Sequence, residues 1–273
     1  FIKRGSKTVK VKDGSDDERR LIELTARIPF DDRINQTASL DDLNLRLIQS
    51  YLKEVRSSLY GDSTKIPFTE LCRHLMIAKG SDELLRPTNA GLLLFNENPD
   101  NFFSGAKIDL VIHKNKVGKD YTEKLFTGSI TQQIRDILQY FKSTIIEELV
   151  VKSAKQAESI RFFNYPFQAL EEAIVNAVYH KSYERENPVE IQIHKDKIEI
   201  LSFPGPLPPI NQAMLKKQRV VARDYRNRKI GGFLKELKLT EGRGTGLPII
   251  HSSMEENGSP PPVFETDENN AYF

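Results

Sequence analysis

Glu172 and Asn176 are the residues of this 273-residue sequence whose types and spacing first suggest chemistry. Apolar residues recur at helical spacing between Phe167 and His180, so a carboxylate and a carboxamide four positions apart reach the same space. An amide oxygen can bind Mg²⁺, and a carboxylate can orient a water molecule for attack on a phosphate. A solvated helix face has the same spacing, so the pair predicts a site only together with a second feature.

A glycine-rich segment supplies that second feature. Gly242, Gly244 and Gly246 surround Thr245 and lead into a predicted helix at 249–256. Glycines let the backbone approach a ligand, and the start of a helix offers unpaired N–H groups to a phosphate. A purely structural loop between two helices is the alternative. The pattern Gly-x-x-x-x-Gly-Lys-Ser/Thr does not occur in the chain, which excludes a P-loop motor.

A basic segment precedes the glycines. Residues 216–229 contain seven basic residues and a single acidic one. Four arginines of the segment could contact the phosphates of a nucleotide or of DNA, and a solvated loop is the alternative. These arginines are Arg219, Arg223, Arg226 and Arg228.

Composition limits the class of protein. The chain has 40 Lys and Arg against 38 Asp and Glu, so its net charge of +2 gives no whole-chain argument for a polyanionic partner. The single cysteine, Cys72, excludes an intramolecular disulfide and a cysteine-cluster zinc site, and it fits a reducing compartment. Apolar runs such as 90–95 are too short to cross a bilayer. We therefore expect a cytoplasmic protein without a membrane segment.

The hydrophobic pattern predicts a mixed α+β chain. Short helices predicted between residues 39 and 95 suit either a winged-helix-like DNA reader or simple packing. The polar stretch 153–159 is the predicted boundary between two units. Helices are predicted after Ser15, after Ser39 and at 129–143, 167–180 and 249–256; strands are predicted at 106–113, 121–126, 145–152, 189–193 and 198–200.

The order of these motifs resembles the GHKL-type ATP-binding fold. The similar variant is that of RecG-like transcriptional regulators, in which an AlbA-type (Schlafen-related) DNA-binding domain comes first. The resemblance covers nearly the whole chain and is carried by Tyr165–His180, Ile200–Pro208, Arg226–Asn227 and Glu241–Leu247, with Leu85–Phe95 and Phe1–Val9 upstream. It implies a tail of an upstream DNA-binding domain at 1–14, a middle α/β unit at 15–152 and a GHKL-like unit at 153–273. The last would be an α/β sandwich whose mixed, mainly antiparallel sheet is covered by helices on one face.

The resemblance also implies roles for individual residues. Glu172 would be the general base and Asn176 the Mg²⁺ ligand, with the three glycines along the triphosphate. The remaining predicted nucleotide-binding residues are Gly205, Arg226 and Thr245, and the other arginines of the basic segment would lie in a lid over the nucleotide. Where GHKL ATPases carry an Asp for the adenine amino group, this chain has residues 202–205, Ser-Phe-Pro-Gly. The chain therefore lacks the carboxylate that contacts adenine in those ATPases.

Three functions are consistent with these residues. The first is a fragment of a DNA-associated transcriptional regulator that binds DNA through an upstream domain and ATP with Mg²⁺ in its GHKL-like unit. The second is a weak Mg²⁺-dependent ATPase that uses Glu172 and Asn176. The third is an interaction module with an empty pocket, and a homo-oligomer is compatible with each. Strand-like segments at Phe1 and Phe273 suggest a piece of a longer protein.

Overall fold

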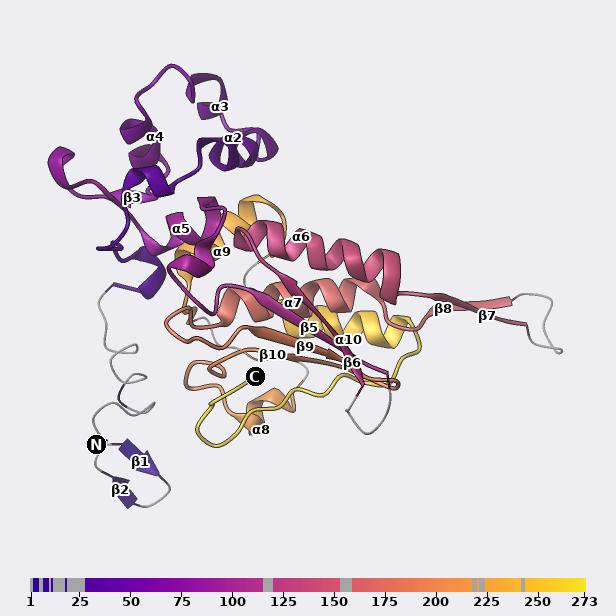
Figure 1. Cartoon of the computed structure of the whole chain (residues 1–273). Coiled ribbons are helices and arrows are strands. Elements are labelled where there is room, and N and C mark those ends of the chain that lie inside the picture. The colour runs from indigo at the N-terminus through magenta and orange to yellow at the C-terminus, as the bar shows by residue number, and fades with distance from the viewer. Residues whose placement is uncertain are drawn as a thin grey trace.

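The computed structural model describes residues 2–4, 7–9, 11, 18, 28–114, 120–152, 159–217, 220, 224–241 and 244–273. Its body is a four-stranded sheet with helices packed on one face (Figure 1). The sheet is mixed and mainly antiparallel, so the predicted α+β fold class is confirmed. The helix predicted after Ser15 lies outside the described residues.

The sheet has the strand order β10–β9–β5–β6. Its strands are β5 (Ile108–His113), β6 (Tyr121–Phe126), β9 (Val189–Ile193) and β10 (Ile198–Leu201). The two central strands, β5 and β9, are parallel and place Leu110 opposite Ile191, both fully buried. A parallel pair needs a long crossover, and the chain between β6 and β9 supplies it.

The crossover contains the helices that cover the sheet. They are α6 (Ile130–Tyr140), followed by a π-helical turn at Phe141–Ile145, and α7 (Phe167–His180); α10 (Gly246–Glu256) packs on α7. The side chain of Ser129 accepts a hydrogen bond from the Gln132 amide, which fixes the start of α6. The bounds of α7 are those predicted from its apolar spacing.

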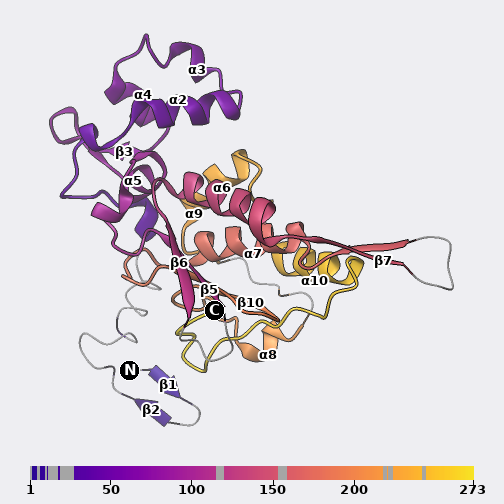
Figure 2. The same cartoon turned by 45° about the vertical axis from the view of Figure 1, so that its right-hand side comes forward.

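A two-stranded hairpin projects from this body. It consists of β7 (Glu148–Lys152) and β8 (Ser159–Phe163), and it extends beyond the helices in both views (Figures 1 and 2). The sequence predicted a strand at 145–152 but no partner for it. The base of the hairpin is bonded to the end of α10, because the Asn257 side chain accepts from the Phe163 amide and donates to its carbonyl.

Smaller elements complete the chain. Upstream of the sheet lie α2 (Leu45–Glu54), α3 (Leu59–Asp62), α4 (Phe68–His74), the hairpin β3 (Ala78–Lys79) and β4 (Arg86–Pro87), and α5 (Asn89–Phe95); β1 (Ile2–Arg4) and β2 (Lys7–Val9) form a separate hairpin, and α8 (Gln212–Leu215) and α9 (Arg228–Glu236) flank the basic segment. The helix predicted after Ser39 is divided. A 3-10 turn at 40–42 comes first, and α2 begins at Leu45 because the side chain of Asn44 caps it.

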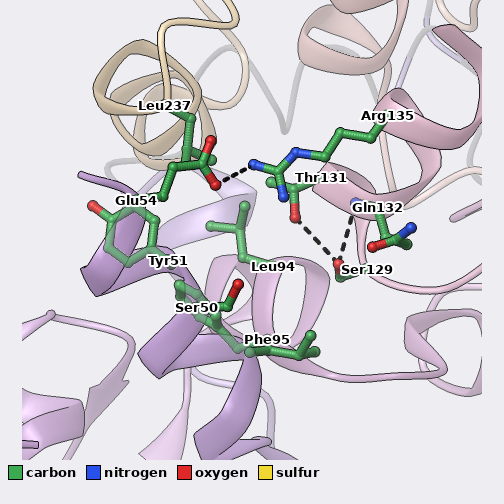
Figure 3. Close-up of a pocket in the computed structure, with 11 residues that line it drawn as sticks. Ser50, Tyr51, Glu54, Leu94, Phe95, Ser129, Thr131, Gln132, Arg135 and Leu237 are labelled. Carbon is green, nitrogen blue, oxygen red and sulfur yellow. Dashed lines mark hydrogen bonds and ion pairs between the residues drawn. The ribbon is translucent and has the colours of Figure 1, made fainter. Parts of the chain in front are cut away.

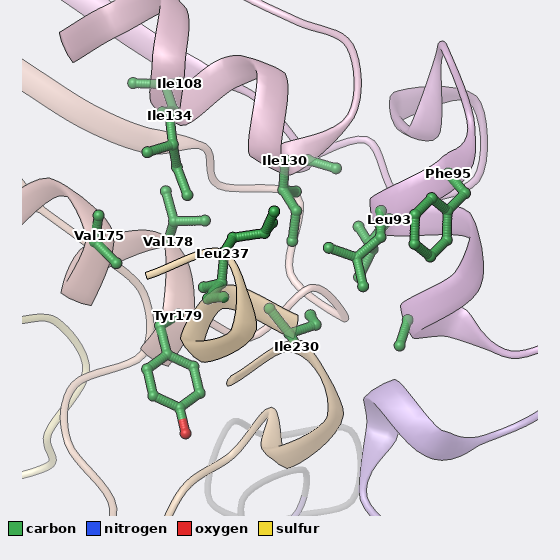
Figure 4. Close-up of a cluster of buried hydrophobic side chains, with 14 of the residues drawn as sticks. Leu93, Phe95, Ile108, Ile130, Ile134, Val175, Val178, Tyr179, Ile230 and Leu237 are labelled. Atoms are coloured by element: carbon green, nitrogen blue, oxygen red, sulfur yellow. The ribbon is translucent and has the colours of Figure 1, made fainter. Parts of the chain in front are cut away.

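One hydrophobic core joins the upstream part to the sheet. Figure 4 shows Leu93 of α5, Ile130 of α6, Val178 of α7 and Ile230 of α9 converging in it. The sheet itself takes β5 and β6 from before residue 153 and β9 and β10 from after it. The division into two units at residue 153 therefore stays a prediction. The residues before and after it share one hydrophobic core and one sheet.

A buried lysine follows α7. The Nζ atom of Lys181 donates to the carbonyls of Gly105 (2.7 Å) and Asn187 (2.8 Å), and burial lowers the pKa of this amine to about 7. An unfolded lysine keeps its proton up to a pKa of 10.5, so the unfolded chain binds more protons between these values and the free energy of unfolding rises with pH there. We expect Lys181→Met to lose this rise, as measured by urea unfolding at pH 7 and pH 9. If the free energy of unfolding rose equally between these pH values in the variant and the wild type, the lowered pKa of Lys181 would be contradicted.

Candidate functional site

The structure brings Glu172 and Asn176 together on α7. The Nδ2 atom of Asn176 donates to Oε1 of Glu172 over 2.9 Å, and both side chains are half-buried. Because the amide nitrogen of Asn176 faces the carboxylate, its carbonyl oxygen is the atom left for another ligand.

Gly246, the first residue of α10, lies directly against this pair. A Cβ atom at this position would be 2.6 Å from Oε1 of Glu172 and still closer to Nδ2 of Asn176. Real Cβ atoms essentially never approach other atoms so closely, so a side chain at this position would have to displace the ends of Glu172 and Asn176. Of the two glycines of the segment that the structure describes, Gly246 and not Gly244 is thus in contact with the carboxylate and the carboxamide.

Neighbouring carboxylates favour a cation at the pair. Burial raises the pKa of Glu172, the Asn176 amide lowers it, and the charges of Glu241 and Glu171 raise it further. Within the described residues, no group of three or more His, Cys, Asp or Glu side chains could hold a metal ion by itself. Mg²⁺ is commonly bound by one or two protein oxygens together with substrate phosphates, and the oxygens of Glu172 and Asn176 fit that donor set.

The rest of the glycine-rich segment lies at the start of α10. Gly244 has a φ of 71°, in the left-handed region that favours glycine. The Thr245 carbonyl accepts from the Ile249 amide and so begins the helix. The positive end of the α10 dipole therefore lies beside Glu172 and Asn176, where it favours an anion. Three predicted site residues, Gly242, Arg219 and Arg223, lie outside the described residues.

Gly205 and Arg226 have neighbours of a different kind. A Cβ at Gly205 would be 2.7 Å from Oγ1 of Thr266, and the Gly205 amide donates to the Asn270 carbonyl. The buried Arg226 guanidinium donates to the carbonyls of His180 and Gly205. The structure thus joins these two residues to the C-terminal segment and to the end of α7, and their contact with a nucleotide stays a prediction.

Arg228 is the remaining predicted phosphate contact. Its Nη2 atom lies 3.7 Å from Oδ1 of Asp224, and both side chains are exposed. An exposed pair of this kind contributes little to stability, so the guanidinium can exchange Asp224 for a phosphate at small cost.

Sequence reasoning missed the importance of Asn227 and assigned no role to His180. Asn227 is fully buried, and its amide donates to the carbonyls of Tyr179 and Lys181; the Arg226–Asn227 match to the resembled family was the signal that could have found it. His180 stacks on Tyr225 with ring centroids 5.7 Å apart, and burial lowers its pKa to about 4. The imidazole is therefore neutral at physiological pH.

A pocket elsewhere in the molecule does not include these residues. It lies between α2, α5 and α6, where an ion pair joins Glu54 and Arg135 (2.6 Å; Figure 3). Its volume of about 50 Å³ has room for a few water molecules only. The candidate site is therefore defined by the contact of α7 with α10.

Among the described residues, no helix is both long enough and apolar enough to span a bilayer.

The C-terminal part of the chain matches a known family. Residues 186–272 match the family model described as "Putative ATP-dependent DNA helicase recG C-terminal". The match supports a RecG C-terminal-like, ATPase-type domain and includes Gly205, Arg226 and Gly246. It begins after α7, so the placement of Glu172 and Asn176 rests on the geometry above.

A solved structure supports the fold over nearly the whole chain. The crystal structure of the DIP2311 protein from Corynebacterium diphtheriae is similar with a TM-score of 0.63 and 19% identity, over 93% of this chain and 49% of that chain. At this identity the likeness shows the fold alone, and the chain spans about half the length of that protein. The comparison with curated proteins finds no match. Fold and family match together define an α+β protein with an ATPase-type C-terminal part.

Proposed function

We propose that this chain belongs to a DNA-associated transcriptional regulator whose C-terminal unit binds ATP with Mg²⁺ between α7 and the start of α10. The observation that carries the proposal is the contact of the Gly246 backbone with Glu172 and Asn176. It joins an oxygen donor set for Mg²⁺ to a helix N-terminus suited to phosphate.

The residues of the site have separate tasks. Asn176 offers its carbonyl oxygen to the metal, while its amide hydrogen bond holds Glu172 in place. Gly244 and Gly246, with Gly242, let the backbone lie along the triphosphate. Bound Mg²⁺ would supply positive charge that offsets the charge of the phosphates. Arg228, together with Arg219 and Arg223, is the proposed source of further phosphate contacts.

Adenine selectivity is expected to be weak. The backbone of Ser202 is paired with Phe273, and the segment 202–205 contains no carboxylate to accept the adenine amino group. A hydrogen bond to a charged group contributes about 1.5–3 kcal/mol, so its absence weakens binding roughly tenfold or more. We therefore expect similar affinities for ATP and GTP.

ATP hydrolysis is the second candidate, favoured by the environment of Glu172. Burial raises the pKa of this carboxyl, and a raised pKa makes its carboxylate a better proton acceptor at neutral pH. Glu172 would orient a water molecule and take its proton as the water attacks the terminal phosphate.

DNA association is proposed for the longer protein, through a domain upstream of the residues described here.

Thermal unfolding tests the nucleotide site. ATP with Mg²⁺ at about a hundred times its Kd should raise Tm by roughly 5 °C, since such saturation adds about 2.7 kcal/mol to the free energy of unfolding. ATP with EDTA should raise it much less, because Asn176 then has no metal to bind. An unchanged Tm with millimolar ATP and Mg²⁺ would contradict the proposal.

The proposed DNA association is tested by duplex binding of the full-length protein at two salt concentrations. No binding at either concentration would count against it.

A further inference from the structure

The start of α9 is capped from a distant part of the chain. The helix begins inside the basic segment, at Arg228, and its first N–H groups need acceptors. Asn227 stands at the N-cap position, but its side chain donates instead to the carbonyls of Tyr179 (2.7 Å) and Lys181 (2.8 Å). Its Oδ1 atom, the acceptor that would normally cap α9, makes no hydrogen bond, so the first amides of the helix are left to another acceptor.

Asp31 takes over that task. Its Oδ2 atom accepts hydrogen bonds from the amides of Lys229 (2.7 Å) and Ile230 (3.1 Å), although 198 positions separate Asp31 from Lys229. The Asp31 side chain is fully buried. Burial raises its pKa to about 6, so the group is largely ionised at neutral pH, and negative charge stabilises a helix N-terminus.

The segment around Asp31 is held firmly on its other side. The side chain of Asn89, at the start of α5, donates to the Phe30 carbonyl, and the Asn89 amide donates to the Arg33 carbonyl. Arg33 also pairs with Glu184, in the loop after α7, over 2.9 Å. Residues 30–33, which we call the clasp, are thus fixed to α5 and to the chain that follows the site helix (Figure 1).

From α9 the connection continues to the candidate site. The side chains of Arg226 and Asn227 cap the three carbonyls at the end of α7, those of Tyr179, His180 and Lys181. The ring of Tyr179 packs on Gly231 of α9 so closely that a Cβ there would overlap it. Any shift of the start of α9 therefore displaces the C-terminal turn of α7, one turn after Asn176.

We propose that Asp31 is a positioning residue for the nucleotide site. By capping α9 it holds the end of the basic segment and the end of α7 in the arrangement that lets Asn176 and Gly246 meet. The inference rests on the proposed function for its ligand, and it goes further in linking that ligand to the clasp. Because coupling is reciprocal, nucleotide binding must in turn strengthen the cap that Asp31 provides.

Three variants test this role in the complete chain. Asp31→Ala removes the acceptor, and Asp31→Asn keeps an oxygen that can accept both hydrogen bonds. Asp42→Ala is the matched control, because Asp42 also caps a helical turn, in the capping box with Ser39 ahead of α2. The readouts are the Kd for ATP with Mg²⁺ and, without nucleotide, amide hydrogen exchange of residues 172–181.

The expected results separate positioning from general stability. Asp31→Ala should weaken ATP binding about fivefold or more and speed exchange at 172–181, since coupling between sites is typically 5–150-fold. Asp31→Asn should stay within about threefold of the wild type, and Asp42→Ala should change neither readout. If folded Asp31→Ala binds like the wild type, or if Asp42→Ala weakens binding equally, the inference is wrong.

Two further outcomes are decided by other measurements. If the wild type binds no nucleotide, the proposed function fails, and the positioning role of Asp31 is then tested by hydrogen exchange alone. Faster exchange at 172–181 in Asp31→Ala but not in Asp42→Ala supports that role. Equal exchange rates in the two variants overturn it. If Asp31→Ala does not fold, exchange in the wild type decides. ATP with Mg²⁺ should slow exchange of the Lys229 and Ile230 amides, and unchanged exchange in the nucleotide-bound protein overturns the inference.

Discussion

Replacing Gly246 by alanine is expected to destabilise the protein and to abolish nucleotide binding. The new Cβ would lie 2.6 Å from Oε1 of Glu172 and closer still to Nδ2 of Asn176, so either α10 moves or the hydrogen bond between the two side chains breaks. Inserting an extra carbon into a packed core costs typically 1–3 kcal/mol, and the low end of that range, about 1 kcal/mol, applies to these two half-buried side-chain ends. We expect a loss of roughly that size in the free energy of unfolding, measured by urea titration, and no Tm increase with ATP and Mg²⁺.

Gly232→Ala is the matched control for this prediction. Gly232 lies inside α9, and a Cβ there would meet nothing within 4 Å. Alanine is favoured over glycine in a helix by about 1 kcal/mol, so this variant should be as stable as the wild type or more stable. If Gly246→Ala lowers the free energy of unfolding and Gly232→Ala does not, the effect is due to the contact with Glu172 and Asn176. A Gly246→Ala protein with wild-type stability and wild-type ATP binding would contradict the site geometry.

Asn176→Ala is expected to have the largest effect on ligand binding. It removes the proposed metal ligand and the hydrogen bond that lowers the pKa of Glu172, so that pKa should rise further. Loss of groups that merely support a metal ligand already costs 10–100-fold, and we expect the Kd for ATP with Mg²⁺ to rise by about a hundredfold or more. Calorimetric titration with and without EDTA measures this, with Gln168→Ala, at an exposed position in the first turn of α7, as the control.

Glu172→Gln distinguishes binding from hydrolysis at the same site. Glutamine keeps an oxygen for the Asn176 amide but cannot take a proton, so binding of ATP should persist while any phosphate release stops. Phosphate release that continues in this variant would exclude Glu172 as the base. If Asn176→Ala and Gln168→Ala bind ATP equally well, Asn176 is not a metal ligand.

Local patterns in the sequence were enough to find most elements near the site. The apolar spacing of α7 and the alternation of β9 predicted the bounds that the structure has, because each element buries one face against the core. The strand β8 was not predicted. It is a short apolar run after a polar stretch, and its extended form depends on pairing with β7. The first turn of α2 was placed too early, because the cap at Asn44 competes with the one at Ser39.

The sequence by itself determined the chemical groups of the candidate site and the helix that carries two of them. A carboxylate and a carboxamide one turn apart follow from the helical period, and a glycine-rich segment before a helix is a local pattern. Only the tertiary structure decided that Gly246, and not Gly244, lies in contact with them, and that Asp31 caps α9 from 198 positions away. Such contacts depend on how helices pack and on which helix N-terminus lacks a local cap, and neither is encoded in any local period of the chain.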